Sequence, residues 1–221
     1  AAPAYAQTPV AGTPFVMTRR AQPYTPITGG TQIFAPGSSS GQVATITLPF
    51  PFKYYDRSFT SVSVSSYGVL AMGSVPTISS SPSAPGSSTT NLNGFIAPFW
   101  EFLLVDNGNV RWEVQGTAPQ RVAVIQWSGI DLCCSDDPGF NFQVRLFEGI
   151  SGRLQVRYGA ANLSTSETAF AVMGMEDADG RRPVLFDGTA PACTSGCTVA
   201  DYTGMANTEV DLVQDPGVEL V

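Results

Sequence analysis

Apolar and polar residues alternate with a period of two in segment after segment of this chain, and no stretch shows sustained helical periodicity. Successive side chains of an extended strand point to opposite faces, so each run predicts a strand with one buried and one wet side. The clearest runs occupy residues 46–52, 62–65, 110–115, 140–146, 154–158, 170–172 and 184–186. A continuous apolar run at 122–125, closed by Trp127, predicts a strand that is buried on both faces. Roughly ten strands at short spacing predict an all-β fold, an antiparallel, jelly-roll-like β-sandwich.

Turn-forming residues separate these runs throughout the chain, which contains 22 glycines and 17 prolines. Residues 106–108 (Asp-Asn-Gly) and 149–152 are predicted hairpin turns. Pro98, inside the apolar run 95–100, indicates a sheet edge or a bulge because proline donates no backbone hydrogen bond. The Ser/Pro/Thr-rich residues 74–91 are expected to form an exposed, mobile loop.

The length of 221 residues fits one all-β domain, which we divide into two parts. Residues 1–41 are predicted to form an extended N-terminal arm with two strand-like pieces, 15–18 and 31–34, between recurrent prolines. Residues 42–221 form the β-sandwich domain, which ends in an acidic strand or tail. In that tail, alternation around residues 209–212 predicts the last strand.

Charge and hydropathy limit the partners and the location of the protein. The net charge is −7 and Lys53 is the only lysine, which argues against nucleic acid as a partner. No apolar run approaches the roughly 20 residues that span a bilayer, so no membrane span is expected. Residues 1–4 are typical of a chain after signal-peptide cleavage, and we expect a secreted, extracellular or cell-surface protein.

The four cysteines are even in number and come as two close pairs: Cys133 with Cys134, and Cys193 with Cys197. Two disulfides are favoured over a zinc site, because the chain has no histidine and adjacent cysteines make poor joint ligands. Three pairings are open. Links between the two pairs are preferred, since a disulfide between adjacent cysteines needs an unusual peptide geometry.

A series of short motifs runs in a distinctive order. The motifs are 48–52 (LPFPF), 62–70 (VSVSSYGVL), 95–101 (FIAPFWE), 121–127 (RVAVIQW), 142–149 (FQVRLFEG), 154–159 (LQVRYG) and 172–178 (VMGMEDA). Over about residues 45–187 this order resembles the nidogen-like β-sandwich domains of extracellular and bacterial cell-surface proteins. The resemblance implies a role in adhesion, matrix or surface architecture and implies no catalytic set. The chain departs from the familiar pattern at Tyr67, where asparagine is usual, and at Glu101-Phe102, where an acidic pair is usual.

The absence of histidine excludes Ser-His-Asp and Cys-His catalysis, and disulfide-bonded cysteines are not nucleophiles. Carboxylate pairs of the glycosidase type remain, with Glu101, Glu113, Glu148 and Glu176 as candidates. We expect no enzymatic activity and rank a carboxylate-based hydrolase third among the functions. Glu101 is the candidate that is hardest to explain as a solvent-facing strand residue.

The sequence suggests two classes of ligand, calcium ions and glycans. Calcium is suggested by oxygen-rich turns at Asp136-Asp137, at 106–109 and at 177–179, but turn formation alone explains these residues better, so no cofactor is expected. Glycans bind to exposed aromatic rings, and Tyr54 and Tyr55, at the end of a predicted strand, are the expected ligand contacts. Trp112 and Trp127 fall on apolar positions and are predicted to lie in the core.

The arm is basic and the tail is acidic, which suggests self-association or contact with other surface proteins. One hypothesis is that a strand-like arm segment adds to the open sheet edge of a neighbouring subunit. Its residues are Phe15, Val16, Met17, Thr18, Arg19 and Arg20, or Ile33 and Phe34. The alternative is that the arm packs on its own sandwich or stays disordered. The predicted function is therefore a secreted structural subunit that polymerises by strand exchange, followed by a monomeric adhesive or carbohydrate-binding module.

Overall fold

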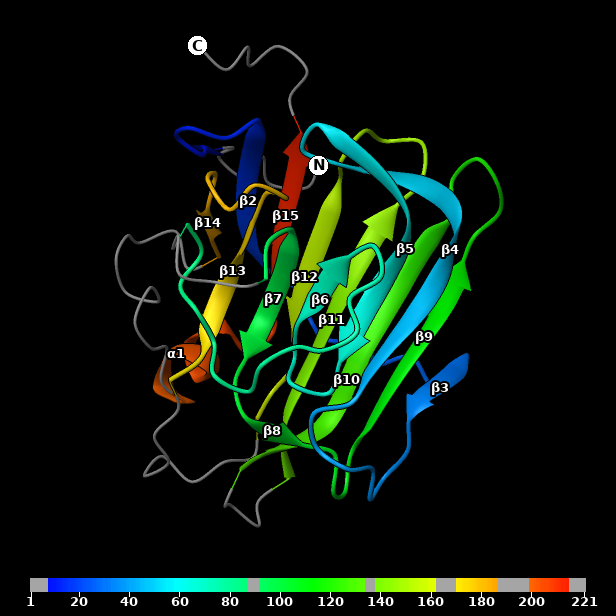
Figure 1. Ribbon diagram of the computed structural model, residues 1–221, viewed down its shortest axis with the longest axis vertical. Coiled ribbons are helices and arrows are strands. Elements are labelled where there is room, and N and C mark those ends of the chain that lie inside the picture. Colours follow the sequence, from blue (N-terminus) through cyan, green and yellow to red (C-terminus); the bar gives the residue numbers. More distant parts are fainter. Residues whose placement is uncertain (1–7, 87–91, 134–137, 162–169, 187–198, 215–221) are drawn as a thin grey trace.

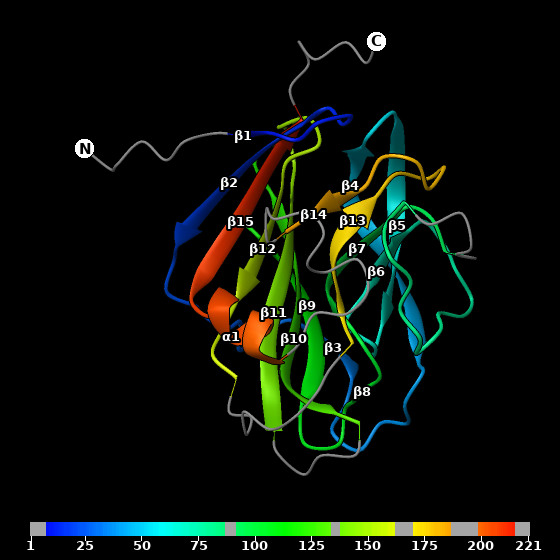
Figure 2. The ribbon, with the colours of Figure 1, turned by 90° about the vertical axis from the view of Figure 1, so that its left-hand side faces the viewer.

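The computed structural model describes residues 8–86, 92–133, 138–161, 170–186 and 199–214. Within these residues the chain forms two antiparallel sheets that pack face to face (Figure 1). The two layers separate clearly in the side view (Figure 2). The predicted all-β sandwich is confirmed.

The larger sheet has nine strands, and its order shows that both ends of the chain meet in it. Its path along the sheet is β1 (Thr8–Pro9), β2 (Phe15–Ala21), β15 (Thr208–Gln214), β12 (Leu154–Tyr158), β11 (Pro138–Phe147), β10 (Val122–Leu132), β9 (Asn109–Gln115) and β3 (Thr31–Phe34). The short strand β8 (Leu103–Leu104) pairs with β10. The predicted last strand is confirmed as β15, which lies between β12 and β2.

The smaller sheet has six strands. Its order is β14 (Val184–Leu185), β13 (Val172–Glu176), β7 (Phe95–Trp100), β6 (Leu70–Met72), β5 (Arg57–Ser65) and β4 (Val43–Tyr54). Along β4 buried and exposed residues alternate as the sequence predicts, because one face of the strand points at the other sheet.

The core lies between the two sheets and is rich in aromatic side chains. Ala123, Val124 and Ile125 of β10 are all fully buried, which confirms the prediction of a strand covered on both faces. Trp127 is buried as predicted, and its indole N–H donates to the Ser65 carbonyl of β5 at 2.9 Å. This bond ties the two sheets together. Trp112 is partly buried and packs against the same core.

The N-terminal segment, predicted as an extended arm, contributes three strands, β1, β2 and β3, to the larger sheet. β2 pairs with β15 over seven residues, whereas β3 pairs with β9 at the opposite edge of the sheet (Figure 1). Residues 22–30, which we call the strap, connect β2 to β3. The strap follows the sheet because buried glutamines hold its backbone: the Gln126 side chain accepts from Ile27 N at 2.7 Å and donates to Ile27 O at 3.1 Å.

A short helix, α1 (Val199–Met205), precedes β15 and was not predicted. Seven residues are too few to show a helical period in the sequence. Tyr202 and Met205 of this helix are buried in the core, so packing rather than helix propensity accounts for it.

Two local predictions around the smaller sheet had different outcomes. The bulge at Pro98 is confirmed, because Ala97 pairs with Gly174 and Trp100 with Val172, which leaves two residues opposite one. The loop after β6 was expected to be exposed, and in its described part, residues 74–86, this holds for several residues but not for all. Ile78 is buried, and the Trp100 indole N–H donates to Ser79 O at 2.9 Å. The loop therefore covers the outer face of the smaller sheet.

Across the described ranges, no helix has the length and apolar character that crossing a bilayer requires.

Candidate functional site

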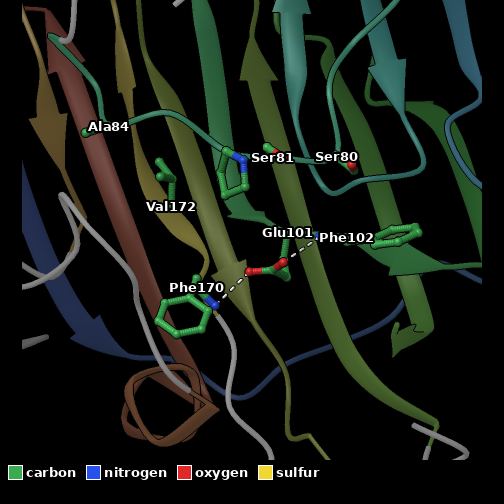
Figure 3. Close-up of a pocket in the computed structure, with 8 residues that line it drawn as sticks. Ser80, Ser81, Ala84, Glu101, Phe102, Phe170 and Val172 are labelled. Carbon is green, nitrogen blue, oxygen red and sulfur yellow. Dashed lines mark hydrogen bonds between the residues drawn. The ribbon is translucent and has the colours of Figure 1, made fainter. Parts of the chain in front are cut away.

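A pocket of about 390 Å³ opens where β7 ends, and it brings together three segments that are distant in the sequence. Its lining comprises Ser80, Ser81, Pro82, Ala84, Glu101, Phe102, Phe170 and Val172 (Figure 3). The serines come from the loop after β6, and Glu101 and Phe102 follow β7. Phe170 leads into β13, whose Val172 pairs with Trp100. This pairing places Phe170 beside Glu101.

Glu101 is held at the pocket by two backbone N–H groups. One carboxylate oxygen accepts from Phe102 N at 2.8 Å and the other accepts from Phe170 N at 2.7 Å (Figure 3). A carboxylate oxygen can accept more than one hydrogen bond, so each retains capacity for a ligand. No lysine or arginine forms an ion pair with Glu101 in the part of the chain that the structure describes. The pocket therefore presents a fixed negative charge.

Two phenylalanines beside this carboxylate are unusually exposed. Phe102 is 37% exposed and Phe170 is 69% exposed; the other large hydrophobic side chains of that kind in the described ranges are Val114 and Ile150. The Phe102 ring packs edge-on against Tyr67, with 5.7 Å between ring centroids. An aromatic rim next to a carboxylate suits binding of a ligand that has both apolar and polar groups.

The other candidate carboxylates lie elsewhere, with partners of their own. Glu148 accepts two bonds from the Arg121 guanidinium, each at 2.7 Å. Glu113 accepts from Gln115 and lines a second pocket of about 310 Å³ next to the strap. Glycosidase chemistry needs two facing carboxylates, and the described lining of the Glu101 pocket includes one.

Glu176 is fully buried at the end of β13, where it accepts from Gly86 N at 2.6 Å. Burial raises the pKa of Glu176 to about 7, and the nearby charge of Asp177 adds to this effect, while the Gly86 bond opposes it. The folded protein therefore binds a proton here that the unfolded chain releases from about pH 4.5 upward.

For this reason Glu176 is expected to make the fold less stable as the pH rises from about 5 to 8, by on the order of 2 kcal/mol. Glu176→Gln, which stays neutral, is expected to match the wild type near pH 5 and to be more stable at pH 8. Urea unfolding of both proteins at the two pH values measures the difference. Parallel stability curves for the two proteins would contradict the expectation.

In the acidic turn at residues 177–179, two aspartates contact arginines of the same chain. The Asp177 carboxylate accepts from Arg182 at 2.7 Å, and Asp179 accepts from Arg57 at 2.8 Å. Within the described ranges, no three side chains of metal-ligating type come together. Asp136 and Asp137 lie outside the described residues.

Tyr54 and Tyr55 were expected to be exposed ligand contacts, and that expectation of exposure is wrong. Each is 1% exposed. Strand β4 continues through Tyr54, whose hydroxyl donates to Phe95 O at 2.7 Å and to Glu176 O at 2.9 Å. The Tyr55 hydroxyl donates to Arg182 O at 2.6 Å. Both rings therefore belong to the core.

The predicted assembly residues pair within their own chain in this structure. Phe15, Met17 and Phe34 are buried and Ile33 is partly buried, whereas Val16 and Thr18 are half-buried and Arg19 is exposed. Arg20 forms an ion pair with Glu209 of β15. Exchange of these residues between subunits stays a prediction.

Of the four cysteines, Cys133 alone lies in the described ranges. It is half-buried after β10, and its backbone N–H donates to Phe102 O at 2.9 Å. Cys134, Cys193 and Cys197 lie outside the described residues, so both disulfides and their pairing stay predictions.

Sequence reasoning singled out Glu101 but missed the rest of its pocket. The signal for Phe102 was present, because this position departs from the acidic pair of the familiar pattern. Phe170 had no such signal, since its place beside Glu101 depends on the pairing of β13 with β7.

The model of the family described as NIDO related matches residues 14–210. The match is wider than the resemblance seen over residues 45–187, and it includes β2, β3 and the first residues of β15. No curated protein and no solved structure gives a significant match to the chain.

Proposed function

Because the chain belongs to the NIDO-related family, whose domains are of an extracellular type, we propose that it is a non-catalytic adhesive domain of a cell-surface or extracellular assembly. The observation that carries the proposal is the Glu101 pocket with its two exposed phenylalanines. Aromatic residues that stay exposed together on a folded surface mark sites where a partner binds. The partner is another surface component of the same assembly.

The position of the pocket supports this role. Its walls are loops and strand ends carried by the smaller sheet, and the aromatic edge contact with Tyr67 holds Phe102 in place before a partner arrives. A preformed site loses little conformational entropy on binding. The described lining of the pocket includes one carboxylate, which suits recognition rather than acid–base turnover.

Adhesion can be tested with beads that carry the protein, added to the surface of the cells that produce it. The double variant Phe102→Ser/Phe170→Ser is expected to reduce bead retention at least tenfold, because aromatic anchors commonly contribute 2 kcal/mol or more each. Ile150→Ser, which changes another exposed apolar residue, is the matched control and is expected to retain adhesion. Equal retention by all three proteins would refute the adhesive role of this pocket.

The second candidate is a filament subunit that polymerises by exchanging β2, and a specific feature of β2 supports it. This strand lies near the edge of its sheet, and Phe15 fills a core site. A neighbouring copy could supply the same strand with the same contacts, with the strap as the hinge.

Val16 and Val213 are directly paired across β2 and β15, so Val16→Cys/Val213→Cys reports which chain supplies the strand. Exchange predicts a ladder of cross-linked chains under non-reducing conditions and fibres in electron micrographs. The single variant Val16→Cys is the control for the native cysteines. A disulfide within a single chain, without a ladder of linked chains, would rule out strand exchange.

A further inference from the structure

We propose that the Glu101 pocket receives a basic side chain, the ammonium of a lysine or the guanidinium of an arginine, from the surface of a partner protein. This inference rests on the adhesive function proposed above and names the chemistry that the pocket recognises. It starts from three features of the pocket: its charge, its aromatic rim and the orientation of its carboxylate.

The charge of the pocket has no counterpart in the described chain. Seven ion pairs are formed there by other side chains, and Glu101 takes part in none of them. The whole chain carries a net charge of −7, so its field attracts cations toward any acidic hollow. A bound ammonium or guanidinium supplies the missing opposite charge.

The carboxylate is also preorganised. Its two oxygens are fixed by the N–H groups of Phe102 and Phe170, at 2.8 and 2.7 Å, so the side chain does not have to be ordered when a ligand binds. The remaining lone pairs of both oxygens accept hydrogen bonds from a donor-only group, and a basic side chain is such a group.

The rim of the pocket favours a cation over a neutral polar ligand. The faces of the Phe102 and Phe170 rings carry partial negative charge, which attracts a cation placed within about 6 Å of a ring centroid. The same rings cover the methylene stem of a lysine or arginine side chain. Ser80 and Ser81 complete the lining with hydroxyl groups that can accept hydrogen bonds from the cation.

The test is a titration of the isotope-labelled full chain, followed by NMR through the amide signals of Phe102 and Phe170. The probes are the blocked amino acids Nα-acetyl-lysine methylamide and Nα-acetyl-arginine methylamide. Nα-acetyl-norleucine methylamide has the same stem without the charge. We expect both basic probes to shift the two signals, the norleucine probe to bind at least about tenfold more weakly, and high salt to weaken the basic probes.

Glu101→Gln keeps the shape of the side chain and removes its charge, and it is expected to weaken binding of the basic probes at least about tenfold. Glu113→Gln, which neutralises the carboxylate of the other pocket, is the matched control and is expected to bind like the wild type. The amide spectrum of each variant reports whether it is folded.

Equal binding of the lysine and norleucine probes, or unchanged binding by Glu101→Gln, would overturn the inference. Shifts at Phe102 and Phe170 with methyl glucoside, but not with the basic probes, would overturn it in favour of a glycan. Bead adhesion separates this failure from failure of the proposed function. If adhesion is lost in the Phe102→Ser/Phe170→Ser variant but the basic probes do not bind, the adhesive function stands and the pocket binds a different ligand.

Discussion

Glu209→Gln is expected to lower the free energy of unfolding by about 3–5 kcal/mol, because it leaves two arginines without their shared partner. Glu209 is fully buried on β15. One of its oxygens accepts from Arg20 of β2 and the other from Arg157 of β12, the latter at 2.6 Å. Glutamine retains one acceptor oxygen and turns an NH₂ group toward the other arginine.

The surroundings make this loss hard to compensate. Arg145 lies in the same region of the sheet, where burial and, to a smaller extent, the neighbouring charge of Arg157 lower its pKa to about 10. The buried Nε of Arg20 already lacks a hydrogen-bond partner in the described structure. Removing the carboxylate therefore leaves neighbouring arginines without the buried negative charge that two of them share.

Urea unfolding at pH 7 measures the effect, and Asp211→Asn is the matched control. Asp211 lies two residues along the same strand and binds Arg153 through two hydrogen bonds, at 3.1 and 2.9 Å. The side chains of this second pair are 25% and 13% exposed, so its loss is expected to cost about 1 kcal/mol. A loss for Glu209→Gln no larger than that for Asp211→Asn would show that the buried carboxylate does not anchor β2.

This ion-pair network shows where prediction from the sequence stops. The strands were predictable, because alternation with a period of two is a local property of the chain. The contact of Arg20 with Glu209 joins residues 189 positions apart, and it depends on the register of β2 against β15. The basic arm and the acidic tail were taken to suggest contacts between subunits or with other surface proteins. The contact partner within the chain could not be deduced without the sheet order.

The predicted exposure of Tyr54 and Tyr55 was wrong for a different reason. Every second residue of β4 is buried, and this alternation includes Phe50, Phe52 and Tyr54. Tyr54 therefore occupies a buried position of the same pattern, although it was expected to be exposed. Tyr55 adopts a φ of +52° and turns its ring under Arg182, whose guanidinium carbon lies 4.9 Å from the ring centroid. A left-handed conformation of a bulky residue has no sequence signal.

The candidate pocket was predictable in one residue. Glu101 stood out because it follows an apolar run and has no role as a solvent-facing strand residue. The aromatic rim comes from a strand pairing at long range, and the covering loop looked unstructured because its composition is that of a linker. The composition of a segment indicates how it behaves in isolation. It does not show that residues 74–86 pack on the outer face of the smaller sheet.

Phe15→Ala is expected to lower the free energy of unfolding by about 3–4 kcal/mol, although the residue lies in a segment that looks like a dispensable arm. Phe15 is 1% exposed, and its ring packs edge-on against Tyr55 with 4.9 Å between centroids. Truncation leaves a cavity under β2 that neighbouring aromatic rings cannot fill without moving. Val16→Ala, on the outward-facing neighbour, is the control and is expected to cost about 1 kcal/mol or less.

The shape of the unfolding curve carries as much information as its midpoint. If β2 is an integral strand, Phe15→Ala shifts a single transition that all probes share. If the segment is a loosely docked arm, the same variant frees it locally and leaves the midpoint of the sandwich unchanged. The first result also constrains assembly, because a neighbour that replaced β2 would have to bring a phenylalanine to the same site. Mixing the Phe15→Ala protein with the wild type would then stabilise the variant only if strands are exchanged.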